Sequence, residues 1–257
     1  MLKIHHIRNA TMVIETEKDV ILIDPMLGEK GSWNTLTFFR FKPQKNPTVV
    51  FPSESKKILE KVTHCIITHK HPDHIDKSGE KFLRENKIPV TCSIKDQKHF
   101  KKKGLILSKS IDYWEESAFL GGTIEGIPAK HGYQFIAKLM GNVMGFFIKL
   151  PNQKSIYISA DTIYTTAVDN VLKTYKPDIS VVACGTAQLD LCKPLLMKMD
   201  DIIKFVKNAP NIVIANHLEA INHCPTTREE LKKELVSTKL LDKVKIPNDG
   251  DTLVFLE

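Results

Sequence analysis

One short segment carries most of the chemistry in this chain. The run Thr-His-Lys-His-Pro-Asp-His holds four potential metal ligands within six positions: His69, His71, Asp73 and His74. Imidazole and carboxylate groups are the ligands that Zn²⁺ and similar cations favour in proteins. Pro72 resists the interior of a helix, so the segment is predicted to be a loop whose side chains converge on a metal centre. The alternative is a surface cluster of histidines.

Further ligand candidates follow apolar, strand-like runs of the sequence. The residues that come directly after these runs are Asp24, His69, His131, Asp161 and His217. Ligand crevices in open α/β sheets form outside the carboxyl ends of strands, so these residues are expected to meet. Each has an ordinary alternative when taken singly, namely a surface histidine, a helix cap or a core histidine. Together they provide enough donors for two metal ions.

Charge and reach suggest how the donors divide between two cations. Divalent cations about 3.5–4 Å apart repel each other, so anions must bridge them. Asp161 is the expected carboxylate bridge, and a hydroxide from solvent is the expected second bridge. The remaining ligands are predicted to split into two sets, one of His69, His71 and His131, the other of Asp73, His74 and His217. Asp24 is expected to orient one of the ligand imidazoles.

The elements that position these residues alternate along the chain. Strands are predicted over 2–7, 11–15, 20–24, 65–68, 90–92, 123–128, 145–150, 155–159, 179–183, 212–215 and 252–256. Helices are predicted over 53–62, 76–87, 95–103, 165–175, 199–208 and 227–236, with Ser53 and Asp76 as N-caps of the first two. Strand-rich and alternating blocks occur twice. The pattern therefore predicts two similar halves, each a sheet with helices on one face, packed into an α/β sandwich.

An irregular stretch at about 26–52 interrupts this pattern and is rich in aromatic residues. Its Trp33, Phe38, Phe39 and Phe41, with Tyr133, Phe135 and Met140, are expected to form an apolar wall or lid near the metals, or to pack against a second subunit. Nearby lysines at 30, 130 and 138 are candidates to attract a phosphate or carboxylate, and the alternative is that they are solvated surface charges.

Composition limits the class of protein. The chain has 257 residues, 42% apolar and 26% charged, which suits one large domain or two small ones, and a single domain spanning 1–257 is expected. Five scattered cysteines, the lack of a secretory pattern at the N-terminus and the lack of a membrane-spanning run favour a cytoplasmic protein. The net charge of +7 favours an anionic partner, but no basic arm with interleaved aromatics is present, so nucleic acid is not expected.

These motifs resemble the metallo-β-lactamase-fold hydrolase superfamily. The His-x-His-x-Asp-His loop is intact, and His131, Asp161 and His217 follow in the family's order, with Asp24 as its strand-end aspartate. The resemblance implies an αββα four-layer sandwich of two mixed β-sheets flanked by helices. It also implies two divalent ions at one edge, Zn²⁺ above all, with Mn²⁺ as an alternative. The segment from Asn216 to Pro225 looks most similar to the ascorbate-6-phosphate-lactonase branch.

The expected function is metal-dependent hydrolysis of a small lactone, ester or phosphoester by a hydroxide that the two metals activate. Four residues are expected to act in catalysis: Asp73, His217, Glu219 and His223, the last two with plain structural hydrogen bonding as the alternative. Three other functions stay open, namely a nuclease or phosphodiesterase, a mononuclear iron dioxygenase and a non-catalytic binding protein. A homo-oligomer is also compatible with the sequence.

Overall fold

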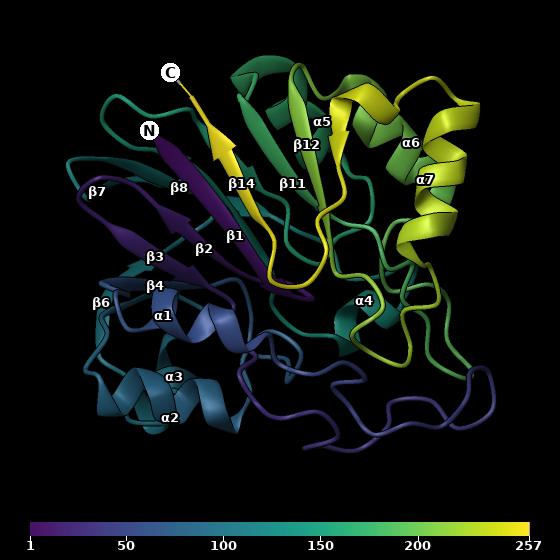
Figure 1. Ribbon diagram of the computed structural model, residues 1–257, viewed down its shortest axis with the longest axis horizontal. Coiled ribbons are helices and arrows are strands. Elements are labelled where there is room, and N and C mark those ends of the chain that lie inside the picture. The colour runs from purple at the N-terminus through teal and green to yellow at the C-terminus, as the bar shows by residue number, and fades with distance from the viewer. Residues whose placement is uncertain (257) are drawn as a thin grey trace.

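Two mixed sheets of seven strands each pack face to face, with helices on the outer face of each (Figure 1). The computed structural model describes residues 1–256; residue 257, the last of the predicted domain, lies outside the described residues. The predicted α/β architecture, an αββα four-layer sandwich, is therefore confirmed. The two ends of the described chain lie side by side, because the first strand pairs with the last.

The first sheet has the strand order β14-β1-β2-β3-β4-β5-β6. Its strands are β1 (Leu2–Arg8), β2 (Thr11–Glu15), β3 (Val20–Ile23), β4 (His64–Ile67), β5 (Val90–Ser93), β6 (Leu107–Ile111) and β14 (Thr252–Phe255). Strands β3 to β6 pair in parallel, whereas β14, β1, β2 and β3 pair antiparallel. Side chains alternate between faces as a strand requires, so that Ile21 and Ile23 face the other sheet and Leu22 faces the helices.

The second sheet repeats this arrangement in the order β13-β12-β11-β10-β9-β8-β7. Its strands are β7 (Glu116–Phe119), β8 (Gly122–Pro128), β9 (Met144–Lys149), β10 (Ile156–Ile158), β11 (Ile179–Ala183), β12 (Ile212–Asn216) and β13 (Val244–Lys245). Strands β10 to β13 pair in parallel, and β8 and β10 both pair antiparallel with β9. Consequently β8, β10 and β12 run in the same direction, and their carboxyl ends lie at one edge of the sandwich.

The helices cover the two outer faces. Apolar side chains of α1 (Lys56–Leu59), α2 (Lys77–Glu85) and α3 (Gln97–Lys102) pack on the first sheet, and those of α5 (Thr166–Asn170), α6 (Met199–Asn208) and α7 (Arg228–Ser237) pack on the second. Asp76 caps α2 as predicted, since its carboxylate accepts from the Gly79 N–H at 2.8 Å. The predicted helix over 165–175 is α5 followed by a π-helical turn, Val171–Tyr175.

Some predicted elements differ from those observed. The helix predicted over 53–62 is a 3₁₀ turn, Ser53–Ser55, followed by the short α1, and Pro52 takes the cap position predicted for Ser53. Beyond Glu60 the chain continues in turns, with the Val62 N–H bonded to the carbonyl of Leu59. Five elements lie outside the ranges predicted from the sequence, none longer than five residues: β6, β7, β13, the helix α4 (Ile136–Leu139) and the 3₁₀ turn Leu241–Lys243.

Candidate metal centre

The sandwich edge gathers the residues that follow the strands. Asp24 comes directly after β3, and His217 comes directly after β12. His69 follows β4, His131 follows β8 and Asp161 follows β10, each within three residues of the end of its strand. The backbone at Asp24 (φ 47°), Ala160 (φ 56°) and His217 (φ 60°) is left-handed, which turns the chain sharply where each strand ends. Left-handed backbone is costly for residues other than glycine, and such strain concentrates at functional sites.

Seven side chains converge there in two groups. Within each group the potential ligand atoms lie within 4.8 Å of one another; the first group is His69, His71 and His131, and the second is Asp73, His74, Asp161 and His217. This division matches the one expected from charge and reach. All seven are buried except His71, which is half-buried and so marks the side of the cluster closest to solvent.

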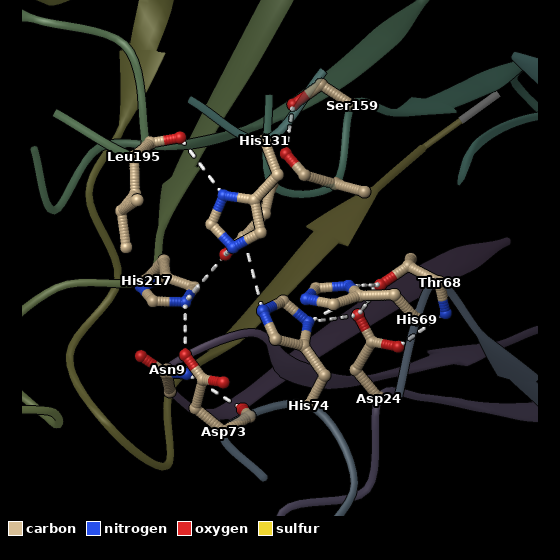
Figure 2. Close-up of polar contacts among 12 residues, drawn as sticks. Asn9, Asp24, Thr68, His69, Asp73, His74, His131, Ser159, Leu195 and His217 are labelled. Carbon is tan, nitrogen blue, oxygen red and sulfur yellow. Dashed lines mark hydrogen bonds and ion pairs between the residues drawn. The ribbon is translucent and has the colours of Figure 1, made fainter. Parts of the chain in front are cut away.

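Asp161 lies between the two groups. Its Oδ1 is 3.2 Å from Nε2 of His74, and its Oδ2 is 3.4 Å from Nε2 of His131. His217 Nε2 lies 3.2 Å from Asp73 Oδ2 (Figure 2). The same nitrogen lies 3.6 Å from Asp161 Oδ2. A carboxylate that reaches members of both groups has the position that a bridge between two cations requires.

The opposite nitrogen of four of these imidazoles is anchored, which orients the rings. Nδ1 of His74 lies 2.8 Å from Asp24 Oδ2, and Nδ1 of His131 lies 3.0 Å from the carbonyl of Leu195 (Figure 2). Nδ1 of His69 lies 3.0 Å from the Thr68 hydroxyl, and Nδ1 of His217 lies 3.4 Å from the sulfur of Cys224. Ligand histidines in metal sites are usually held in this way, because the second hydrogen bond fixes the ring and its tautomer.

Asp24, which follows β3, also connects this strand to Thr68 at the end of β4. Besides contacting His74, its carboxylate accepts from the backbone N–H of Thr68 at 2.8 Å and from the Thr68 hydroxyl at 2.7 Å. It is almost fully buried. The expectation that Asp24 orients a ligand imidazole therefore has the geometry it needs, with His74 as that imidazole.

Asn9 is a site residue that the sequence analysis missed. It is fully buried in the β1–β2 turn with left-handed backbone (φ 53°). Its side-chain amide donates to the backbone carbonyl of Asp73 at 2.9 Å. Its backbone carbonyl accepts from the backbone N–H of His217 at 2.9 Å. Asn9 therefore ties the motif loop of the first half to the last ligand of the second half. In the sequence it looks like an ordinary hairpin-turn residue, so no local signal marks it.

The histidines of the cluster fall into two electrostatic classes. Burial lowers the pKa of His131 to about 4, with only partial compensation from Asp161, and it also lowers the pKa values of His69 and His71. Burial acts on His74 and His217 as well, but nearby carboxylates outweigh it. Asp161 and Asp24 raise the pKa of His74 to about 10, and Asp161 and Asp73 help to raise that of His217.

This difference predicts proton release when a cation binds. A cation needs the free lone pair of Nε2, so His74 and His217, protonated at pH 7 without metal, must each lose a proton. We expect Zn²⁺ binding to release up to two protons and its affinity to rise about tenfold per pH unit for each proton released. Calorimetric titration in two buffers of different ionisation enthalpy measures the number. Binding without proton release would contradict these protonation states.

The same shift links pH to the stability of the metal-free protein. Folding raises the pKa of His74, so His74 contributes to the free energy of unfolding of the metal-free protein. This contribution is complete when the pH is below the ordinary histidine pKa near 6.5, and it is lost as the pH rises toward 10. The depressed pKa values of Asp73 and Asp161, which their histidine partners bring about against the effect of burial, act in the other direction and remove stability as pH falls.

Unpaired polar atoms indicate that this donor set fits a cation. Among residues 1–256, eight buried side-chain nitrogen or oxygen atoms make no hydrogen bond, and four of them belong to this cluster: Nε2 of His69, His74 and His217, and Oδ1 of Asp161. Three of the four have only ion-pair contacts inside the cluster, between His74 and Asp161 and between His217 and Asp73, both at 3.2 Å. A buried polar atom without a hydrogen bond costs about 1–3 kcal/mol, and a cation that accepted these lone pairs would remove that cost. Three imidazole nitrogens and a carboxylate oxygen are the donors that a divalent cation would accept.

Two residues expected to be catalytic lie outside the two groups. The carboxylate of Glu219 contacts the Arg228 guanidinium and accepts from the Arg228 backbone N–H at 2.9 Å, so its contacts support the structural alternative. His223 is buried, with Nδ1 3.9 Å from the sulfur of Cys224. A catalytic role for His223 remains a prediction.

The irregular stretch over 26–52 packs beside the candidate metal ligands. Trp33 and Leu36 contact an apolar cluster that includes Met26, Ile136 and Leu195. Two polar side chains hold the stretch in place: Asp190 accepts from the backbone N–H groups of residues 38–40, and Asn222 bonds to residues 35–37 and 46.

The predicted aromatic wall forms only in part. Trp33 and Met140 pack into the apolar cluster, but Phe38, Phe39 and Phe135 are exposed. Tyr133 turns toward α6, where its hydroxyl bonds to Asp201 and Lys198 lies over its ring.

The amino-acid sequence matches the family described as "Beta-lactamase superfamily domain" over residues 20–217, a range that includes every member of both groups. The chain belongs to the β-lactamase superfamily. Its fold and the positions of its histidines and aspartates confirm the resemblance seen in the sequence. The narrower assignment to the ascorbate-6-phosphate-lactonase branch stays a prediction.

Relatives within the superfamily resemble the chain over its whole length. The UPF0173 protein YddR of Bacillus subtilis is 33% identical over 99% of this chain and 100% of its own. An isothiocyanate hydrolase from Delia radicum gut bacteria has a TM-score of 0.87 and 31% identity, covering 98% of this chain and 99% of that one. A "possible metal-dependent hydrolase" from Veillonella parvula has a TM-score of 0.89 and 26% identity, covering 99% and 100%. None of the helices in residues 1–256 combines the length and apolar character that crossing a bilayer requires.

Proposed function

We propose that this protein is a metal-dependent hydrolase of small molecules with two divalent ions, Zn²⁺ above all, at the sandwich edge. The observation that carries the proposal is the convergence of seven histidine and aspartate side chains, four of whose buried atoms make no hydrogen bond within residues 1–256. When bound, the two cations would supply Lewis acidity and would make water nucleophilic near neutral pH. His69, His71 and His131 would hold one, Asp73, His74 and His217 the other, and Asp161 would reach both.

The protein groups have distinct tasks in such a reaction. Asp161 neutralises charge between the two groups, and the anchored Nδ1 atoms keep the imidazoles oriented. Asp73 presents Oδ2 to His217 at 3.2 Å, and it is the carboxylate placed to accept a proton from the attacking water or return it to the leaving group. His223, buried behind this group, is a second candidate for proton transfer.

The substrate class is proposed from the site and its relatives. A small lactone, ester or phosphoester offers an electrophilic carbon or phosphorus atom that water can attack. An isothiocyanate is a second candidate, favoured by the 31% identity with a hydrolase of that substrate over nearly the whole chain. It also has an electrophilic carbon, and its substituent would lie against Leu36 and Met140, which are half-buried and pack against the apolar cluster.

A substrate panel tests this function. The purified protein, loaded with Zn²⁺ or Mn²⁺, is assayed on lactones, nitrophenyl esters, bis(4-nitrophenyl) phosphate, an arylalkyl isothiocyanate and short RNA. We expect turnover of at least one small substrate, abolished by chelation and restored by metal, and no cleavage of RNA. Turnover of RNA alone would instead support the nuclease alternative. All five cysteines are free thiols, which is consistent with the cytoplasmic location that we propose.

A further inference from the structure

A buried cysteine lies behind the second group of ligand candidates. The sulfur of Cys224 is 3.4 Å from Nδ1 of His217, yet Cys224 belongs to neither group of potential ligands. The corresponding nitrogen faces an oxygen atom in three other histidines of the cluster, which are His69, His74 and His131. His217 therefore differs from these three histidines, because the atom that faces its Nδ1 is sulfur and not oxygen.

The direction of this hydrogen bond follows from the tautomer that metal binding requires. Nε2 of His217 points toward Asp73 and Asp161, at 3.2 and 3.6 Å. A neutral imidazole that offers the lone pair of Nε2 to a cation carries its proton on Nδ1. That N–H must donate, and the sulfur of Cys224 lies where the acceptor is needed.

The backbone holds the sulfur tightly in this position. A Cβ atom at Gly185 would lie 2.2 Å from the His217 carbonyl oxygen and 3.1 Å from the sulfur, so only glycine leaves room for both. The Cys224 N–H bonds to the carbonyl of Ile221 at 3.0 Å, which closes the turn that brings Cys224 back to His217. Cys224 is buried and belongs to the same apolar cluster as Ala183, Ala187 and Leu196.

We propose that Cys224 is a positioning residue whose sulfur accepts the hydrogen bond from Nδ1 of His217, and thereby fixes the tautomer and ring orientation of that imidazole for the second cation. The proposal rests on the proposed metal centre.

The test is a titration of the metal-free full chain with Co²⁺, followed by its absorption spectrum. Cys224→Ala removes the acceptor, and Cys224→Ser replaces sulfur with an acceptor oxygen. Cys92→Ala is the control, because Cys92 is also buried but packs in the helix-facing cluster of the first sheet. Removing a group that orients a metal ligand typically costs about 10–100-fold in affinity. If Cys224→Ala does not fold, Cys224→Val fills the space without an acceptor.

We expect the wild type and Cys92→Ala each to bind two equivalents of Co²⁺, and we expect the two proteins to have the same affinities. The variant Cys224→Ala should keep one tight equivalent and bind the other at least about tenfold more weakly, and Cys224→Ser should recover most of that loss. Wild-type affinity in Cys224→Ala, or a serine variant as weak as the alanine variant, would overturn the proposal. A thiolate-to-cobalt band that disappears in Cys224→Ala would also overturn it, because Cys224 would then be a ligand. Failure of wild type to bind any Co²⁺ would instead refute the proposed metal centre.

Discussion

Replacing Asp161 with alanine is expected to abolish binding of at least one cation and to lower the hydrolytic rate by more than about a hundredfold. The reason is its position, because its two oxygens lie 3.2 Å from His74 and 3.4 Å from His131, which belong to different groups. Losing a group that merely orients a ligand costs about 10–100-fold, and losing a shared anionic ligand should cost more. Without it, two cations would also repel each other with less charge between them.

The measurement is metal content by mass spectrometry together with the rate on the best substrate of the panel. Asp161→Asn keeps the shape of the side chain but loses the charge, and we expect it to fall between wild type and alanine. Asp200→Ala, which removes an exposed carboxylate from the first turn of α6, is the control and should retain both metals. If Asp161→Ala kept two tightly bound metals and full activity, the bridging role would be wrong.

The variant Asp24→Ala should destabilise the metal-free protein by about 3–5 kcal/mol, the usual cost of removing one partner from a buried ion pair. The carboxylate contacts Nδ1 of His74 at 2.8 Å and accepts two hydrogen bonds from Thr68, so alanine leaves three polar groups without this partner. Urea unfolding with chelator present, at pH 7, measures the loss.

A matched variant separates charge from backbone effects. Asp24 has left-handed backbone, with φ at 47°, and asparagine tolerates that conformation better than alanine does. We therefore expect Asp24→Asn to lose only about 1–3 kcal/mol, because an amide oxygen can still accept from Thr68. Equal stability of wild type and Asp24→Ala would show that His74 does not depend on this carboxylate.

The candidate ligands could be predicted because their signal is local. His69, His71, Asp73 and His74 lie in one short loop, and His131, Asp161 and His217 each follow an apolar strand-like run. The parallel arrangement of such strands brings their carboxyl ends together. Predicting that these residues meet therefore required the direction of the strands more than their order in the sheet. The two-halved fold was predictable for the same reason, since each half repeats one pattern of strands and helices.

The supporting residues could not be predicted because their contacts are between distant parts of the chain. Asn9 reaches Asp73, which lies 64 residues later. Asn222 bonds to residues 35–37 and 46 across more than 170 positions, and nothing near Asn222 in the sequence indicates that partner. Glu219 was expected in catalysis because it lies near His217 in the sequence. Its contact with Arg228 was not expected, and its catalytic role stays a prediction.

Short elements escaped prediction for a related reason. The helix expected over 53–62 has helix-forming residues, yet it ends at Leu59, and the chain then turns into β4. The two strands of the β7–β8 hairpin are joined by Leu120 and Gly121, both with positive φ, and a leucine at the first of these positions gives no turn signal in the sequence. Tertiary packing decides these boundaries, and local preference does not.

Metal stoichiometry tests the central claim most directly. The chain, purified without chelator, is analysed by mass spectrometry and then titrated with Zn²⁺ after metal removal, and hydrolytic activity is followed at each addition. We expect two zinc or manganese ions per chain at saturation, with full activity only when both are bound. A single iron per chain would favour the dioxygenase alternative, and activity that survives complete removal of metal would rule out a metal-dependent hydrolase.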